Sequence, residues 1–167
     1  MKLNLGCGED IREGYENVDI INEKDIIYMD LNYGLRYRND SINEIQCHHT
    51  LEHLDNPNKF MLELYRVCED KAEIHLSVPH FSFFGTYADL THKYNGFSYF
   101  TFGNGNWNKE LYPKFKVESY LNFTRTRFLW LNWFINPIIN LMPTFYERFL
   151  CYVLPCSEIQ FKLEVKK

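Results

Sequence analysis

The stretch KLNLGCG at residues 2–8 decides the fold. Its first residues are apolar enough for a short buried strand, and the first glycine ends that strand. The sequence glycine, small residue, glycine lets the backbone approach a ligand closely, because neither glycine carries a Cβ. In an open parallel sheet, ligands bind beyond the carboxyl ends of the strands. The stretch therefore predicts a strand that ends under a ligand, with a simple tight turn as the alternative.

Further strands are expected along the chain, each as a short run rich in β-branched or aromatic residues between turn-forming residues. They are Tyr15–Ile20, Asp25–Leu31, Ser41–Cys47, Glu73–Val78, Phe115–Phe123 and Glu158–Val165. Between the fourth and fifth strands, Asn56 offers a helix N-cap and Pro57 a first helical residue. Phe60, Leu64 and Val67 then recur at helical spacing. This strand–helix–strand unit predicts a parallel sheet.

The connections between the first three strands are short. A parallel crossover takes about a dozen residues or more, helix included. The chain from Gly8 to Val18 leaves little room for one, and the chain from Ile20 to Asp25 is shorter still. We therefore expect helices there to be single turns or missing, with cover supplied by the aromatic second half or by a partner chain.

Length and charge limit the classes of function. The 167 residues suit a single domain, 1–167. We divide it into a cofactor-binding half (1–80), a substrate-side loop and strand (81–124), a helical insertion (125–157) and a last strand (158–167). There are 18 basic residues against 22 acidic ones and no basic block, which argues against nucleic acid as the main partner. Five cysteines without a CxxC pair, and no apolar leader after Met1, predict a reducing cytoplasm.

Acidic residues end the next two predicted strands. Asp19 can accept both hydroxyls of a ribose, and Asp30 can meet an adenine edge while Leu31 packs on its face. Loop capping is the alternative for each aspartate. The dinucleotide fingerprint needs a third glycine where this chain has Ile11, so a nicotinamide enzyme is not favoured. Three strand ends in a row predict a nucleoside-binding site.

With these motifs in this order, the chain resembles the class I S-adenosylmethionine-dependent methyltransferases, in the compact branch found beside sugar and cell-surface biosynthesis genes. The matching segments are residues 3–8, 14–19, 30–31, 40–45, 49–54, 63–67 and 78–80, within roughly residues 2–100. The resemblance implies a Rossmann-like α/β sheet, mostly parallel with an antiparallel last strand. In this chain the first half of that sheet is abbreviated, and a helical insertion precedes the last strand.

The resemblance also implies a cofactor, S-adenosyl-L-methionine, and a role for each matching residue. Gly6, Cys7 and Gly8 would lie under its methionine part, Asp19 would hold the ribose, Asp30 and Leu31 the adenine, and Cys47 and His48 would contact the methionine end. At Cys7 we expect a small side chain rather than a catalytic thiol. Relatives carry a helix before the glycine strand, and this sequence does not show one. The resemblance therefore does not say which segment shields the methyl donor from water.

A second group of polar residues is rich in histidine. His48, His49 and His53 follow the fourth strand, His80 follows the fifth, and Asp89 and His92 lie in the next loop. Methyl transfer to oxygen needs a positioned nucleophile and a base, and histidine titrates near neutrality. We predict His80, Asp89 and His92 as catalytic residues. Metal binding and hydrogen bonds that stiffen the loop are the alternatives, and without tight ligand spacing we expect no metal.

Two segments are unusually apolar. The first is a ring-rich loop, for which we expect a mainly core role and keep sugar or sulfonium stacking as the alternative. Its rings are Phe81, Phe83, Phe84, Tyr87, Tyr94, Phe97, Tyr99, Phe100, Phe102 and Trp107. The second, residues 128–154, is too short and too broken by Asn and Pro to span a bilayer. It can cover the sheet, form a homodimer contact, or lie on a membrane and serve a lipid-linked acceptor.

The sequence thus predicts transfer of a methyl group from S-adenosylmethionine to a small-molecule or saccharide acceptor, at oxygen. Two alternatives remain: a non-catalytic binding module that keeps the same sheet, and an interaction protein at a membrane face.

Overall fold

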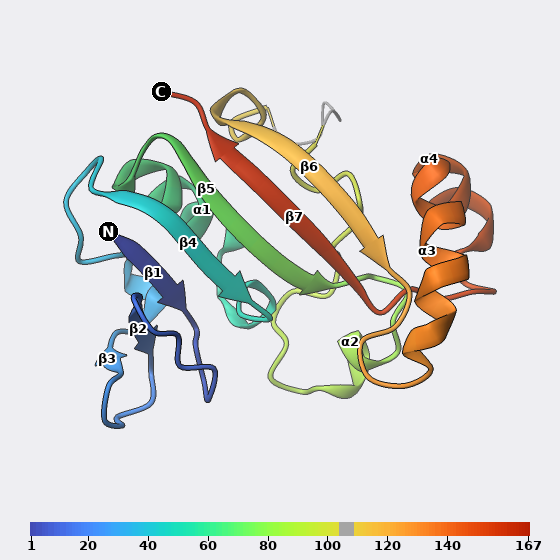
Figure 1. Ribbon diagram of the computed structural model, residues 1–167, viewed down its shortest axis with the longest axis horizontal. Helices are drawn as coiled ribbons and strands as arrows, with labels where there is room; N and C mark the ends of the chain where they lie inside the picture. The colour runs from blue at the N-terminus through green and yellow to red at the C-terminus, as the bar shows by residue number, and fades with distance from the viewer. Residues whose placement is uncertain (104–108) are drawn as a thin grey trace.

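The computed structural model describes residues 1–103 and 109–167, apart from the side chain of Tyr112. Its centre is a seven-stranded sheet in the order β3-β2-β1-β4-β5-β7-β6 (Figure 1). The strands are β1 (Lys2–Leu5), β2 (Glu16–Asp19), β3 (Ile27–Tyr28), β4 (Ile42–His48), β5 (Cys68–Pro79), β6 (Phe115–Asn122) and β7 (Glu158–Val165). The pairs among β1 to β5 are parallel, and β7 is antiparallel to both of its neighbours. The predicted fold class is confirmed.

The described residues form four α-helices, with shorter helical turns between them. The helices are α1 (Pro57–Val67), α2 (Gly85–Ala88), α3 (Asn132–Leu141) and α4 (Pro143–Phe145), and the turns are η1 (Leu31–Tyr33), η2 (Leu51–His53), η3 (Tyr112–Lys114), η4 (Leu129–Leu131) and η5 (Tyr146–Leu150). α1 begins as predicted, because the Asn56 side chain accepts a hydrogen bond from the backbone N–H of Lys59. Its apolar stripe, which includes Phe60 and Leu64, is buried.

The strands β2, β4 and β6 match their predicted bounds to within one residue at each end. β1 and β7 have the predicted bounds. β5 begins at Cys68, directly after α1, because Cys68 already pairs with Ile42 of β4. The register of this pairing then shifts, and Lys71 takes a left-handed φ of 64°. β3 is shorter than predicted, since only Val18 and Asp19 of β2 pair with it.

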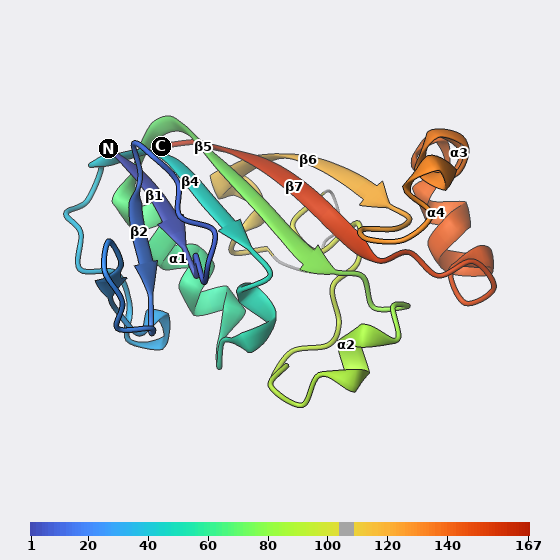
Figure 2. The ribbon, with the colours of Figure 1, turned by 60° about the horizontal axis from the view of Figure 1, so that its bottom comes forward.

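The two faces of the sheet are covered unequally. α1 and α2 lie on one side, the covered face, and no helix in the described residues lies over the opposite side, the open face (Figure 2). The expected loss of helices between β1, β2 and β3 is therefore confirmed. Side chains toward the covered face are apolar and buried, among them Leu3, Leu5, Val18, Ile45, Cys47, Ile74, Leu76, Leu121, Phe161 and Leu163. The alternate positions are polar, among them Lys2, Glu44, Gln46, His48, Glu73, His75, Lys116, Glu118, Gln160 and Lys162.

The helical segment before β7 packs against the edge of the sheet (Figure 1). Three asparagines at helical spacing in α3 accept hydrogen bonds from the backbone beyond and within β6: Asn132 from Thr124, Asn136 from Phe123 and Asn140 from Leu121, at 2.8–3.0 Å. Asn132 and Asn140 also donate to the carbonyls of Thr124 and Leu121. Side chains of α3 thus pair the free backbone groups that an edge strand leaves exposed.

Candidate functional site

A cavity of about 540 Å³ lies at the carboxyl ends of the first four strands. Its walls include Gly6 after β1, Asp19 from β2, Asp30 and Leu31 after β3, and His49 and Thr50 after β4. This is the edge at which open parallel sheets bind ligands. The structure brings together the end residues of β1, β2 and β3 that the sequence singled out.

The glycine turn is closed by backbone bonds and leaves no room for a larger residue. Gly6 N–H donates to the Val18 carbonyl at 2.8 Å, and Gly6 takes a left-handed φ of 65°. A Cβ at this position would lie 2.1 Å from Oγ1 of Thr50. The close approach of Thr50 therefore requires glycine at position 6.

Asp19 joins this turn to β2 through both of its carboxylate oxygens. Oδ2 accepts from the backbone N–H of Gly8 at 2.8 Å, and Oδ1 accepts from that of Ile20 at 2.6 Å. Each carboxylate oxygen can accept more than one hydrogen bond. The two oxygens are therefore fixed in position and can still accept from a diol in the cavity.

Asp30 combines a polar edge with an apolar neighbour. Its Oδ1 accepts from the backbone N–H and the side-chain amide of Asn32 at 2.9 and 3.0 Å. Its Oδ2 has no hydrogen-bond partner among the described residues. Leu31 and Met29 beside it are buried and line the cavity. One free acceptor next to apolar side chains suits the amino edge and the face of a purine.

Four predicted cofactor residues, Cys7, Gly8, Cys47 and His48, do not line this cavity. Gly8 contributes only its backbone N–H to Asp19. Cys7 is buried, and burial raises the pKa of its thiol. Cys47 points to the covered face, where burial raises its pKa to about 12. His48 belongs to the open face and bonds to Ser77 at 2.9 Å and Gln46 at 3.0 Å; burial, then the charge of Arg12, lowers its pKa.

His49, one residue further on, lines the cavity instead. Its left-handed φ of 49° is unusual for a residue with a Cβ, and it lies where the chain leaves β4 for η2. Its ring bridges two carboxylates, with Nδ1 3.2 Å from Glu52 and Nε2 3.0 Å from Glu158. Burial lowers the pKa of His49, but the bonds to Glu158 and Glu52 outweigh burial and leave that pKa raised. The same bond helps to hold the pKa of Glu158 at about 2 against burial.

The three predicted catalytic residues lie in two groups. His92 and Asp89 are together, with Nε2 3.7 Å from Oδ2, and the His92 ring packs on His53, which lines the cavity. His80 is fully buried; Ser82 lies 2.7 Å from its Nδ1 and Glu147 lies 3.3 Å from its Nε2. His80 therefore ties the loop after β5 to η5, and it does not line the cavity.

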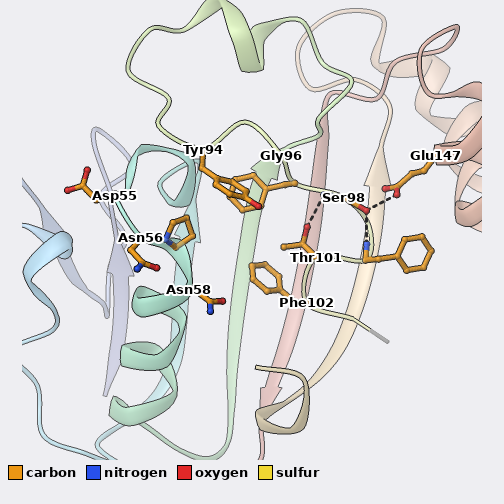
Figure 3. Close-up of a pocket in the computed structure, with 12 residues that line it drawn as sticks. Asp55, Asn56, Asn58, Tyr94, Gly96, Ser98, Thr101, Phe102 and Glu147 are labelled. Atoms are coloured by element: carbon orange, nitrogen blue, oxygen red, sulfur yellow. Dashed lines mark hydrogen bonds between the residues drawn. The ribbon is translucent and has the colours of Figure 1, made fainter. Parts of the chain in front are cut away.

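A second cavity, of about 840 Å³, lies between the start of α1 and the loop at residues 94–102 (Figure 3). Tyr94, Phe97 and Ser98 line one side, and Ser98 Oγ donates to Glu147 at 2.7 Å.

The rings of the ring-rich loop differ in burial. Phe97 and Phe102 are buried, Phe84, Tyr87 and Tyr94 are exposed, and Trp107 lies outside the described residues. The two cavities adjoin, because Leu54 and Lys93 line the first while their chain neighbours Asp55 and Tyr94 line the second. Lys93 Nζ bonds to Asp55 at 2.8 Å between them.

Sequence reasoning did not assign several residues of these sites. Thr50, Thr91 and Lys93 line the first cavity, while Glu147 and Glu158 partner histidines from far along the chain. A signal existed for Glu158, which opens the strand that pairs with β5 beside its carboxyl end. No sequence signal existed for Glu147, because its contact with His80 depends on how η5 packs against the loop after β5.

Neither a family model nor a curated protein sequence matches the chain, whereas solved structures do. A SAM-dependent methyltransferase from Archaeoglobus fulgidus aligns over 99% of this chain and 85% of its own, with 19% identity and a TM-score of 0.58. YcgJ from Bacillus subtilis aligns over 99% and 91%, with 11% identity and a TM-score of 0.64. A phosphoethanolamine N-methyltransferase 2 from Haemonchus contortus, in complex with S-adenosyl-L-methionine, aligns over 99% and 48%, with 14% identity and a TM-score of 0.58.

The fold is that of the class I S-adenosylmethionine-dependent methyltransferases. The strand order and the antiparallel β7 are the features shared with this methyltransferase fold. At 11–19% identity the likeness concerns the fold alone. What this methyltransferase-like chain binds must be argued from its own residues.

Among the described residues, no helix is long and apolar enough to cross a membrane.

Proposed function

We propose that this protein transfers the methyl group of S-adenosylmethionine to a hydroxyl oxygen of a small-molecule or saccharide acceptor. The observation that carries the proposal is the cavity at the strand ends, where Asp19 is held by Gly8 and Ile20 and keeps acceptor capacity. A ribose diol fits those oxygens. Asp30 and Leu31 suit the adenine, and Gly6 lines the same cavity at the end where we place the methionine part.

The chemistry is a displacement at carbon. The acceptor oxygen forms a bond to the methyl carbon while the carbon–sulfur bond breaks and its electron pair passes to sulfur, which leaves as a neutral thioether. The hydroxyl proton must go to a base, and His92 with Asp89 beside it is the group predicted for this role. His80 acts as a positioning residue in this proposal, since its bonds to Ser82 and Glu147 fix the loop that carries Asp89 and His92.

We assign the acceptor to the second cavity. Tyr94 and Phe100, which are at least partly exposed, offer ring surface for the apolar face of a sugar, and Asn56 and Ser98 offer hydrogen-bonding groups. This combination of rings and polar groups supports a hydroxylated acceptor. The Lys93–Asp55 pair between the cavities would adjoin both bound molecules.

Calorimetry of S-adenosylmethionine binding tests the donor site. Asp19→Ala should bind at least tenfold more weakly, because a hydrogen bond to a charged group contributes about 1.5–3 kcal/mol and about 1.4 kcal/mol is tenfold. Asp25→Asn, at an exposed acid between β2 and β3, is the matched control and should bind as the wild type does. Micromolar affinity that survives in Asp19→Ala would contradict the donor site.

Turnover separates the enzyme from a non-catalytic binding module. Donor labelled in its methyl group is incubated with the protein and cell extract, and label in an acceptor is measured. Donor binding without any transfer of label supports the binding module.

A further inference from the structure

A cluster of metal-binding side chains lies between η2 and the loop after α2, and one of its members, His53, lines the first cavity. Glu52, His53 and His92 each offer one ligand atom within 4.8 Å of the others. Glu52 is only 1% exposed, and its Oε2 is the one buried side-chain polar atom of the described residues that lacks a hydrogen-bond partner. A buried carboxylate oxygen without a partner is costly, and a bound cation would supply one.

Both histidines keep the same ring nitrogen free. Nδ1 of His53 lies 3.3 Å from the Thr91 carbonyl, and Nδ1 of His92 lies 2.9 Å from the Thr86 carbonyl. A carbonyl oxygen can only accept, so each Nδ1 carries the proton and each neutral ring keeps its lone pair on Nε2. Histidines that ligate metals make this same bond from their other nitrogen to a backbone carbonyl. The two rings meet edge to face, with centroids 4.8 Å apart.

The surroundings hold the carboxylate in place as well. Oε1 of Glu52 bonds to Nδ1 of His49, whose Nε2 bonds to Glu158, so Oε2 is the oxygen left for a ligand. Oδ2 of Asp89 lies 3.7 Å from Nε2 of His92 and adds a second carboxylate beside the cluster. Such bonds to ligand groups are what a metal site needs beyond its ligands.

We propose that Glu52, His53 and His92 bind a divalent first-row transition-metal ion such as Zn²⁺. Imidazole ligands favour this class of ion over Mg²⁺, which prefers oxygen ligands only. Three protein ligands leave coordination positions open, as catalytic sites do and closed structural sites do not.

The role of the ion in catalysis rests on the proposed function. A bound ion would lower the pKa of an acceptor hydroxyl that reached it from the adjoining second cavity, and the proton would leave to solvent beside the exposed Asp89. The oxygen then forms its bond to the methyl carbon, and the electron pair of the broken carbon–sulfur bond stays on sulfur. His92 then serves as a ligand rather than as the proton acceptor.

Titration of the metal-free full chain with Co²⁺ tests the site, read from visible absorption bands, with Zn²⁺ added afterwards as competitor. One Co²⁺ per chain is expected, displaced by Zn²⁺ and not by Mg²⁺. Glu52→Gln and His92→Gln should each weaken binding by about tenfold or more. His75→Gln is the matched control, because His75 lies on the open face and pairs with Glu73.

A wild-type chain without a saturable one-to-one signal would overturn the site, as would equal affinity in wild type and His92→Gln. Circular dichroism checks that each variant is folded. Donor binding by calorimetry is measured on the same variants. In the proposed function, Asp19 and Asp30 hold the donor, and neither belongs to the metal cluster. A variant that loses metal affinity and still binds the donor therefore supports the metal site. A wild-type protein that binds the metal but not the donor would refute the proposed function and leave the metal site standing.

A second inference concerns the helical segment, which exposes an apolar surface within residues 128–153. Its exposed side chains include Trp130, Trp133, Leu141, Tyr152 and Val153, with Trp133 76% and Val153 83% exposed. The exposure follows from the docking of α3, whose asparagines bind the backbone at the edge of β6. Ile139 is buried, whereas Trp133, Phe134, Ile138 and Leu141 of the same helix are exposed.

The exposed charges around this apolar surface are positive. Residues 125–157 hold Arg125, Arg127, Arg148 and one acid, Glu147. The Glu147 carboxylate is 11% exposed and bonds to Ser98 and His80. Arg125 pairs with Glu158 at 3.3 Å, whereas Arg127 and Arg148 form no ion pair within the described part of the chain. This local excess of positive charge stands out in a protein of net charge −4.

We infer that the apolar surface binds an anionic lipid bilayer. Tryptophan and apolar side chains enter the interfacial region, and arginines meet phosphate headgroups. A second copy of the chain fits less well, because a two-fold contact through the same surface brings like charges together.

Flotation with vesicles tests this inference. The protein should float with phosphatidylcholine vesicles that contain phosphatidylglycerol and less with phosphatidylcholine alone. Trp133→Ser should reduce flotation several-fold, while Tyr33→Ser, at an aromatic residue 87% exposed elsewhere, should not. Failure to float with anionic vesicles overturns the inference. A dimer in sedimentation that Trp133→Ser dissociates would also overturn it, since a second copy would then cover the surface.

Discussion

The two faces of the sheet differ in what stabilises them. On the covered face, apolar side chains from all the longer strands pack against α1 and the loop after β5. On the open face, polar side chains pair across strands, as Lys2 does with Glu44 at 2.6 Å and Lys162 with Glu73 at 2.8 Å. Parallel sheets are usually covered on both faces, which makes their strands apolar throughout. Here the strands alternate instead, and this alternation lets one face meet water.

The largest expected effect comes from two neighbours on β4. Ile45→Ala should lower the free energy of unfolding by about 2–5 kcal/mol, because it leaves a cavity in the core. Gln46→Ala, on the open face, should cost no more than about 1 kcal/mol, since it loses only hydrogen bonds to Glu44 and His48. Urea unfolding of both variants checks this. Equal losses would show that the open face is covered in solution.

The loop after β5, which packs on the covered face, is held by one carboxylate, that of Glu147. Glu147→Ala should lower the free energy of unfolding by about 2–3 kcal/mol, because Ser98, His80 and the backbone N–H of Tyr99 lose an ionised acceptor. Glu147→Gln is the matched variant and should retain part of this stability. Faster proteolysis of the loop in Glu147→Ala is the second measurement. Unchanged proteolysis would mean that apolar packing alone holds the cover.

Near β1, a hydrogen-bonded loop takes the place of a helix on the open face. The buried amide of Asn4 donates to the Asp10 carbonyl at 2.6 Å and to Asn17 at 3.0 Å, and Asn17 accepts from Arg12 N–H. Asn4→Ala should therefore lower the free energy of unfolding by about 1–2 kcal/mol. Lys116→Ala, exposed on the same face, should cost less than about 0.5 kcal/mol. A similar cost for both would show that the loop is not held by Asn4.

The parts of the fold that local signals determine were predictable. The bounds of β1 and β7 follow from apolar alternation, and the start of α1 follows from Asn56 and Pro57. The end residues of β1, β2 and β3 likewise pointed to the first cavity through Gly6, Asp19 and Asp30.

Other parts depend on backbone geometry and on distant segments. The sequence does not reveal the left-handed backbone of His49, and it points to His48 at the cofactor, whereas His49 is the residue that lines the cavity. His80 was grouped with His92, but its partner Glu147 comes from η5, 67 residues away. The three asparagines of α3 read as breaks in an apolar run, because their backbone partners belong to another segment.

The smallest expected effect is a dependence on pH at the edge of the open face. A hydrogen bond from Lys2, then one from Tyr15, lowers the pKa of Glu44 to about 2 from an ordinary value of 4.5. A carboxyl whose pKa is lower in the folded state contributes stability above its unfolded pKa and loses it as pH falls through its folded pKa. The deficit of Glu44→Gln should therefore be full at pH 7 and shrink between about pH 4.5 and pH 2, as measured by urea midpoints. Lys2→Met should remove most of this deficit, because it takes away the first cause of the shift. A deficit that stays constant across this range would mean that the charge of Glu44 adds nothing to stability, and that its contribution to the open face comes from interactions independent of ionisation.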